Sequence, residues 1–235
     1  MRKMLLFMLF VSSFMYAETL EARMVGENVI GSLDQSVTIS TSMQGIAVST
    51  DNRHIAYIVR SQGRPYVCRD KTNESTYDDI KIDSLVFSPN GNHLAYIVSQ
   101  FGRWMVVLDG SPQGQYDDID SNTLTFSPDS KRLAYIAKGF NGRCVVVDGT
   151  AGEMYTFLKE DSISFSPDSS HLAYIAGSYN QYFIVLDEQK GSDYDMFVNK
   201  AGIVWDSTTT FHYLASSSNR DIYVVTEEID NSEKK

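Results

Sequence analysis

Phe126-Ser127-Pro128-Asp129, followed by Leu133-Ala134-Tyr135, is the stretch of sequence that decides the fold, because it recurs along the chain. A second copy, Phe165-Ser166-Pro167-Asp168 with Leu172-Ala173-Tyr174, lies 39 residues further on. The same interval separates the members of three wider sets: Tyr57, Tyr96, Tyr135 and Tyr174; Asp70, Asp109, Asp148 and Asp187; and Tyr77, Tyr116, Tyr155 and Tyr194. A period of this length is typical of tandem structural repeats. The chain is therefore predicted to consist of several copies of one small unit.

Each repeat is predicted to fold as a meander of four short antiparallel strands. In the second copy, the turn sequences Pro89-Asn90-Gly91 and Asp109-Gly110 help to separate four segments, at residues 85–88, 93–98, 104–108 and 116–119. Four strands of ordinary length and their connections fill a repeat of this size. The second and third segments do not alternate apolar with polar residues, so both faces of the sheet are expected to be buried. Small antiparallel sheets buried on both faces are typical of the blades of a β-propeller.

The number of strands predicts a closed ring of five blades. The last copy stops after its third strand, at 222–226, and residues 36–40 precede the first copy without a match in the repeat. We expect residues 36–40 to supply the missing outer strand, because an unpaired strand edge invites aggregation. First strands are expected to end near Val48, Phe87, Phe126, Phe165 and Trp205. The predicted fold class is all-β: a five-bladed β-propeller of four-stranded antiparallel blades, closed by an N-terminal strand.

The N-terminus has the layout of a secretory signal peptide. Arg2 and Lys3 precede an apolar run, and the small residue Ala17 follows it. The apolar run is too short to span a bilayer comfortably, and an uncleaved N-terminal anchor is the alternative. The mature protein is therefore expected in the periplasm or outside the cell. The predicted organisation is a signal peptide at 1–17, a lead segment at 18–35, the propeller at 36–227 and a polar tail at 228–235.

The charge balance argues against nucleic acid as a partner. The chain has 20 Lys and Arg residues against 30 Asp and Glu residues. Removal of Arg2 and Lys3 with the signal peptide changes the net charge from −10 to −12. A protein of this charge repels phosphate backbones and anionic lipid headgroups. Neither nucleic-acid binding nor membrane insertion is expected of the mature chain.

These motifs resemble those of the TolB-type propellers of bacteria, which are built from Pro-Asp repeats and are relatives of the WD-repeat proteins. The resemblance is carried by the motif copies that begin at Phe126 and Phe165, and it covers roughly residues 40–226. The first and fifth copies depart from it with Ser49-Thr50-Asp51 and Trp205-Asp206-Ser207, as expected where a ring is closed. The resemblance implies a propeller blade but no particular activity, because such blades occur in periplasmic binding proteins, in peptidases with an added hydrolase domain and in other exported proteins.

The residues that most often carry chemistry are predicted to be structural in this chain. Cys68 and Cys144 are separated by a whole repeat, whereas a disulfide needs Cα atoms closer than about 7 Å, so both are predicted to lie in the core. His54, His93 and His171 occupy one slot of the repeat, which spreads them around the ring, so no metal site is expected. The aspartates that precede the turn glycines are expected to cap hairpins. No phosphate-binding glycine loop is present, and no cofactor is expected.

No unique catalytic set stands out. The chain has no Gly-x-Ser-x-Gly elbow, and its Ser-Pro-Asp serines are repeated. The paired carboxylates Asp78-Asp79 and Asp117-Asp118 lie between one repeat and the next, where a solvated acidic rim is favoured over a calcium site. An enzyme is the alternative: a hydrolase or lyase with its site at the mouth of the central channel, using Asp83, Asp120 or Asp161.

The most suggestive feature lies in the loops between the second and third strands. Phe101, Phe140 and Tyr179 share one slot of three consecutive repeats, and Arg64 and Arg103 share another slot nearby. Aromatic residues together with arginine are the usual composition of a binding hot spot. The structural alternative is that each ring packs on its own blade.

The leading hypothesis is an exported, non-enzymatic binding module that presents one propeller face to a protein or peptide partner. Gln62 stands in the aromatic slot of the first repeat, so the blade does not itself require an aromatic residue there. Because the blades are nearly identical, any specific function is expected to depend on their loops. A chiefly structural role in a cell-envelope complex is a further alternative, and the oligomeric state is left open.

Overall fold

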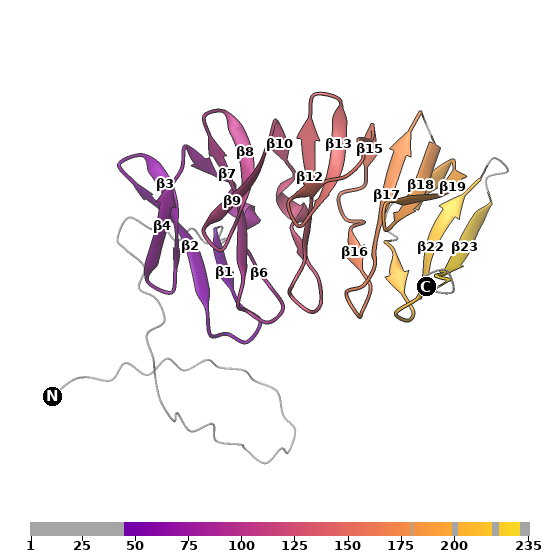
Figure 1. Ribbon diagram of the computed structural model, residues 1–235, viewed down its shortest axis with the longest axis horizontal. Helices are drawn as coiled ribbons and strands as arrows, with labels where there is room; N and C mark the ends of the chain where they lie inside the picture. The colour runs from indigo at the N-terminus through magenta and orange to yellow at the C-terminus, as the bar shows by residue number, and fades with distance from the viewer. Residues whose placement is uncertain (1–44, 180, 199–201, 218–220, 231–235) are drawn as a thin grey trace, which may run out of the picture.

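The computed structural model describes residues 45–230 apart from 180, 199–201 and 218–220. The described residues form five small antiparallel sheets that stand side by side in a row (Figure 1). The sheets follow one another in chain order, and each packs against the sheets of the preceding and following repeats. The fold is therefore all-β and built of stacked antiparallel blades, as the repeat predicts.

Each of the first four sheets is built around a pair of antiparallel strands with further strands on either side, whereas the described fifth sheet has further strands on one side of its pair only. The first sheet contains β1 (Ile46–Val48), β2 (Ile55–Ser61), β3 (Arg64–Arg69) and β4 (Thr72–Thr76). The second contains β5 (Asp79–Ile80), β6 (Val86–Phe87), β7 (Leu94–Gln100), β8 (Arg103–Leu108) and β9 (Ser111–Tyr116). The third contains β10 (Asp118–Ile119), β11 (Thr125–Phe126), β12 (Leu133–Gly139), β13 (Gly142–Val147) and β14 (Thr150–Ala151).

The last two sheets continue the series along the chain. The fourth contains β15 (Phe157–Leu158), β16 (Ser164–Phe165), β17 (Leu172–Ser178), β18 (Gln181–Leu186) and β19 (Gln189–Tyr194). The fifth contains β20 (Met196–Phe197), β21 (Val204–Trp205), β22 (Thr210–Ser216) and β23 (Ile222–Glu228). The predicted ends of the first strands are confirmed, because β1, β6, β11, β16 and β21 end at the expected residues.

The repeated Ser-Pro-Asp motif forms the turn that leads into the second strand. Ser127 Oγ donates a hydrogen bond to Asp129 Oδ1 at 2.7 Å and accepts the backbone N–H of Arg132 at 2.9 Å. The hydrogen bond from Ser127, followed by that from the backbone of Lys131, lowers the pKa of Asp129 to about 2. The N–H of Asp129 donates to Ser169 Oγ of the next repeat at 2.9 Å. The motif therefore closes its own turn and also ties neighbouring blades together.

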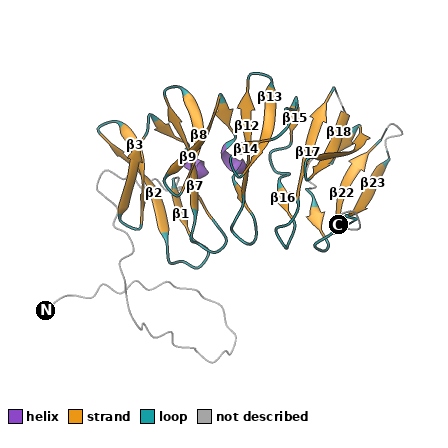
Figure 2. Ribbon diagram, viewed as in Figure 1, coloured by secondary structure: helices purple, strands orange, loops and turns teal. Residues whose placement is uncertain are grey.

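One edge of the middle blades is a broken strand. β5 and β6 both pair with β7, and a 3-10 turn at Ile82–Ser84 separates them (Figure 2). β10 and β11 flank an equivalent turn, Ser121–Thr123, along β12. A hydroxyl group replaces the missing ladder bond, since Ser84 Oγ accepts the N–H of Ile97 at 2.9 Å and Thr123 Oγ1 does the same in the third sheet.

The fourth strand predicted for the repeat is wrong in its extent. The sequence predicts one strand around residues 116–119, but the structure divides the segment between two sheets. β9 ends at Tyr116 as the outer strand of the second sheet, whereas Asp118 and Ile119 form β10 of the third sheet. The reason is that the backbone of β10 pairs with β12 of the next repeat. The paired carboxylates consequently lie at the junction between two blades.

The core lies between the sheets. Four clusters of buried apolar side chains each join two neighbouring sheets. Residues 133–137 of β12 are all at most 2% exposed. Consecutive side chains of a strand point to opposite faces, so this strand is buried on both faces, as its lack of alternation predicts. Cys68 and Cys144 are buried and not joined in a disulfide, which confirms their predicted place in the core.

Replacement of Ala134 by leucine is expected to lower the free energy of unfolding by about 1–3 kcal/mol, because added methylene groups overpack a filled interface. Ala134 is fully buried in the cluster that joins the third and fourth sheets. Urea denaturation measures the change. Ala151 is exposed on β14 of the same sheet, and Ala151→Leu should change stability by less than about 0.5 kcal/mol. Equal effects at the two positions would contradict this packing.

The two ends of the row differ from its middle. The first and fifth sheets lie at opposite ends in Figure 1, and none of the apolar clusters of the described residues joins them. Within the described part of the chain, β23 pairs only with β22. Ile222 and Val224 of β23 are 65% and 68% exposed. Residues 36–40, predicted to supply the missing strand, lie outside the described residues, so closure of the ring stays a prediction.

Candidate binding surface

The hairpins that join the second and third strands of the blades point to one edge of the row (Figure 1). We name this edge the upper rim: it comprises these hairpin tips and the neighbouring connections at 77–79, 116–118, 155–157 and 194–196. Phe101, Phe140 and Tyr179 stand at three of the tips and are 89%, 98% and 93% exposed. The rings therefore do not pack on their own blades, and the structural alternative for them is wrong. Their binding of a partner stays a prediction.

The backbone at two of these tips is unfavourable for a large side chain. Phe101 and Tyr179 have φ values of 51° and 54°, close to the 52° of Gln62 in the first repeat. Gly63 and Gly102, which follow two of these residues, also have positive φ, as in a two-residue type I′ turn. Asparagine and glycine adopt this conformation readily, whereas a bulky residue in it costs about 1–2 kcal/mol. Neither packing nor turn geometry accounts for the aromatic residues.

The predicted arginines are tied to the connections between sheets. Arg64 donates to Asp78 Oδ1 at 2.8 Å and to the carbonyl oxygen of Tyr77 at 3.2 Å. Arg103 makes the equivalent ion pair with Asp117. The side chains of Arg64 and Arg103 are 49% and 45% exposed, so each keeps a surface that a partner can reach. The structure therefore shows that these arginines hold the connections between sheets, while their contact with a partner stays a prediction.

The predicted carboxylate pairs lie on the rim over the first three sheets, where each carboxylate is paired with a cation. Asp79 pairs with Arg60 at 3.1 Å. Asp118 accepts hydrogen bonds from Lys81 Nζ at 2.7 Å and from Lys138 Nζ at 3.0 Å. Burial raises the pKa of Asp118, but the hydrogen bonds from the two lysines outweigh burial and hold the pKa below its ordinary value. No group of three or more His, Cys, Asp or Glu side chains in the described part of the chain could hold a metal ion.

The same slot is apolar in the later repeats. Asp79 and Asp118 correspond to Phe157 and Met196 at intervals of 39 residues. Phe157 is 39% exposed and Met196 is 54% exposed. Met154, beside the hairpin of the third sheet, is also exposed. The upper rim therefore changes from charged, with paired acidic and basic side chains, to apolar along the row. The sequence-based prediction does not include these residues, although an alignment of the repeats reveals the change.

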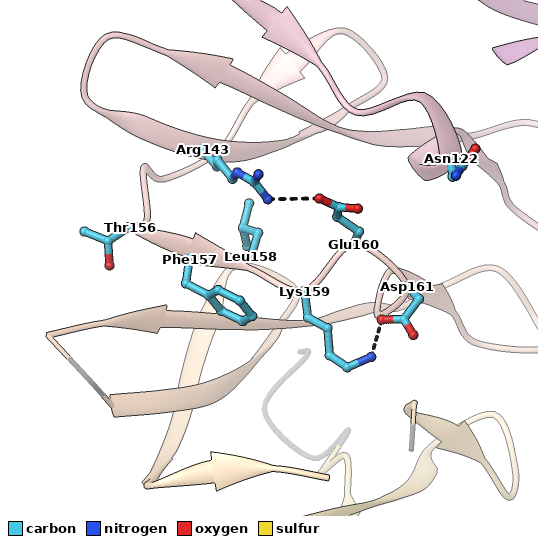
Figure 3. Close-up of a pocket in the computed structure, with 8 residues that line it drawn as sticks. All are labelled: Asn122, Arg143, Thr156, Phe157, Leu158, Lys159, Glu160 and Asp161. Atoms are coloured by element: carbon cyan, nitrogen blue, oxygen red, sulfur yellow. Dashed lines mark hydrogen bonds and ion pairs between the residues drawn. The ribbon is translucent and has the colours of Figure 1, made fainter. Parts of the chain in front are cut away.

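Two hollows flank β15 in the apolar half of the rim. The first, of about 690 Å³, receives charged side chains from Arg143, Lys159, Glu160 and Asp161 (Figure 3). The second, of about 430 Å³, is lined chiefly by apolar and aromatic residues: Phe157, Ile175, Tyr182, Met196 and Phe197. We name them the polar hollow and the apolar hollow. Clefts that combine apolar walls with a few polar groups are the usual form of a binding site.

A network of ion pairs crosses the rim beside the polar hollow. Lys138 Nζ lies 2.6 Å from Asp120 Oδ1, and Arg143 lies 3.5 Å from the other oxygen of this carboxylate. Arg143 also pairs with Glu160 at 3.3 Å. Burial lowers the pKa of Lys138, but the hydrogen bonds to Asp120 and then to Asp118 outweigh burial and raise it. The network joins the third sheet to the segment between β15 and β16 of the fourth.

The three carboxylates of the enzyme alternative lie on three different sheets. Asp83, Asp120 and Asp161 belong to the edges of three different sheets. Asp120 is buried and paired with two cations. A hydrogen bond from Lys159 lowers the pKa of Asp161, whereas a general acid at neutral pH needs a raised pKa. The described geometry therefore favours a structural role for Asp120 and an ionised surface carboxylate at Asp161.

The histidine slot and the aspartate slot form one structural unit. In three sheets, the histidine Nδ1 lies 2.6–2.7 Å from the aspartate of the same blade, in the pairs His54–Asp70, His93–Asp109 and His171–Asp187. The other carboxylate oxygen accepts a backbone N–H at the start of the second strand. These pairs lie at the opposite end of the strands from the upper rim. Both slots are structural, but these aspartates bind the start of the second strand of their blade, whereas the sequence predicts that they cap the adjacent hairpin turn.

Comparison with known proteins finds similar folds only. The chain matches no family model and no curated protein. It is similar to the solved structure of TolB from Acinetobacter baumannii, with 13% identity and a TM-score of 0.41 over 78% of this chain and 51% of that chain. It is also similar to a putative TolB from Agrobacterium tumefaciens, with 15% identity, a TM-score of 0.39 and coverage of 79% and 76%. Streptogramin B lyase is a third such structure, with 15% identity, a TM-score of 0.36 and coverage of 80% and 70%.

The chain thus spans about half the length of TolB from Acinetobacter baumannii. The likeness concerns the fold and agrees with the resemblance to TolB-type propellers that the repeat motif carries.

Proposed function

We propose that the protein is a non-enzymatic binding module that presents the upper rim to a protein or peptide partner. The observation that carries the proposal is the exposure of Phe101, Phe140 and Tyr179 at the hairpin tips. At Phe101 and Tyr179 the positive φ adds a backbone cost to the exposed apolar area. Residues held in such unfavourable conformations are typical of functional sites. Because the fold gains nothing from these rings, recognition is the role that accounts for them.

We further propose that the protein is exported and acts in the periplasm or outside the cell. The proposal rests on the basic and apolar segments of residues 1–17, which lie outside the described residues. In the portion of the chain that the structure describes, no helix has the length and apolar character needed to cross a membrane.

The double variant Phe101→Asn with Tyr179→Asn tests the binding surface. Asparagine suits a position of positive φ in a hairpin turn, so the variant is expected to unfold at a higher temperature than the parent. Loss of two hot-spot side chains is expected to weaken partner binding at least about tenfold. Capture of proteins from a cell-envelope extract, quantified for parent and variant, measures the binding, and thermal unfolding measures the stability.

Gln62→Asn is the matched control, because it makes the same turn substitution in the first repeat. It should raise stability while leaving capture unchanged. Lower stability of the double variant would show that the rings pack against the blades. Undiminished capture of the same proteins would show that the partner binds elsewhere.

A further inference from the structure

The segment from β15 to Asp161 lines the polar hollow (Figure 3), and part of it also lines the apolar hollow. Phe157 and Lys159 line both hollows. A ligand that crosses this segment therefore reaches two surfaces of different chemistry. We name the two hollows together the β15 groove.

The apolar hollow has fixed walls and an uncovered surface. The rings of Phe157 and Tyr182 meet edge to face with their centroids 5.2 Å apart, and Phe197 is buried. Phe157 and Met196 nevertheless keep 39% and 54% of their surfaces exposed. The volume of about 430 Å³ lies within the usual range of ligand sites. A large aliphatic or aromatic side chain is the group that covers such a surface.

The polar hollow presents its negative charges outward. The side chains of Glu160 and Asp161 are 57% and 71% exposed, whereas those of Arg143 and Lys159 are 29% and 10% exposed. Lys159 pairs with Asp161, and Arg143 is shared between Glu160 and the buried Asp120, so the carboxylate is the more exposed member of the Lys159–Asp161 and Arg143–Glu160 pairs. Asp195 adds another carboxylate at the apolar hollow. Together with the net charge of −10 of the whole chain, this arrangement attracts a cationic group.

We infer that the β15 groove binds an extended segment of the partner that carries one large apolar side chain and, a few residues away, a lysine or arginine. The apolar side chain fills the hollow between Phe157 and Met196, and the cation lies against Glu160 and Asp161. The inference rests on the proposed function, because it names the chemistry of the segment that the upper rim recognises.

A library of random ten-residue peptides, displayed on phage and selected on the immobilised mature protein, tests the inference. The selected peptides should share a large apolar residue and a nearby lysine or arginine. A synthetic peptide of this consensus should bind the double variant Glu160→Gln with Asp161→Asn about tenfold more weakly than the parent, and with less dependence on salt. Met196→Asp should weaken binding by removing the apolar contact.

The control is the double variant Glu153→Gln with Glu188→Gln, which removes the same charge near the hydroxyl group of Tyr174. It should bind the peptide with an affinity within about twofold of the parent. An equal loss of peptide affinity in this control would show that net charge alone explains the effect. That result would overturn the inference that the β15 groove binds the peptide. Selection of acidic peptides, or of peptides without a basic residue, would also overturn it.

Failure of the groove can be told apart from failure of the proposed function. If partner binding depends on Phe101 and Tyr179 but not on Met196 or Glu160, the inference about the β15 groove is wrong. The proposed function of the upper rim is then unaffected. Selection of no peptide, together with undiminished protein capture by the variant of Phe101 and Tyr179, would overturn both.

Discussion

Asp187→Ala is expected to lower the free energy of unfolding by about 3 kcal/mol, and Asp148→Ala by about half as much. Asp187 accepts the N–H of Leu172 at 2.9 Å and pairs with His171 Nδ1 at 2.6 Å. The His171 side chain is only 5% exposed, so truncation leaves a buried imidazole without its partner. Asp148 makes the equivalent contact with Arg132, but that side chain is 34% exposed and can turn to water.

The comparison isolates the buried pair from backbone effects. Asp187 and Asp148 have φ values of 46° and 51°, so the strain of placing alanine at positive φ is common to both variants and cancels in the difference. Urea denaturation of the two variants and the parent provides the three free energies. Equal losses, or a loss of less than about 0.5 kcal/mol at Asp187, would show that the histidine–aspartate unit does not stabilise the blade.

Deletion of residues 18–42 from the mature chain is expected to abolish cooperative unfolding. β23 is paired on one side only within the described residues, and Ile222 and Val224 are exposed on it. A strand at 36–40 would add several backbone hydrogen bonds, each contributing about 0.5–1.5 kcal/mol, and would cover apolar surface. The sum is a large part of the stability of an ordinary domain, about 5–15 kcal/mol.

Circular dichroism during heating, together with urea denaturation, measures the effect of this deletion. A shorter deletion, of residues 18–30, removes part of the lead segment but keeps 36–40, and it should unfold like the full mature chain. If the chain that lacks 18–42 also unfolds like the full mature chain, the N-terminal segment does not complete the last blade and the predicted ring closure is wrong.

The blades could be predicted from the sequence because several repeat slots each carry a local physical role. Ser127 and Asp129 close the turn before the second strand, and the aspartates at 148 and 187 bind the start of that strand. The broken edge strand could not be predicted in this way. β10 has only two residues, which is too short for any periodicity, and it pairs with a strand of the following repeat.

The candidate surface could be predicted only in part. The shared slot of Phe101, Phe140 and Tyr179 is visible in the repeat, but their exposure follows from hairpin geometry. Phe157 and Met196 look like ordinary strand residues in the sequence. The hollows beside them form because side chains of neighbouring sheets meet there, which no single repeat encodes. The ion pairs of Arg64 and Arg103 with rim carboxylates also depend on neighbouring sheets. The aspartate of each pair lies in the connection to the next blade.

The two-residue turns at the upper rim bear on how such a protein evolves. The side chains at 62, 101, 140 and 179 point away from every apolar cluster, and each belongs to a separate blade. A mutation at one tip alters the outer surface without repacking the interior or disturbing another tip. New binding preferences usually carry a cost in stability. In this array, the exposed surface can change one residue at a time while the scaffold stays intact.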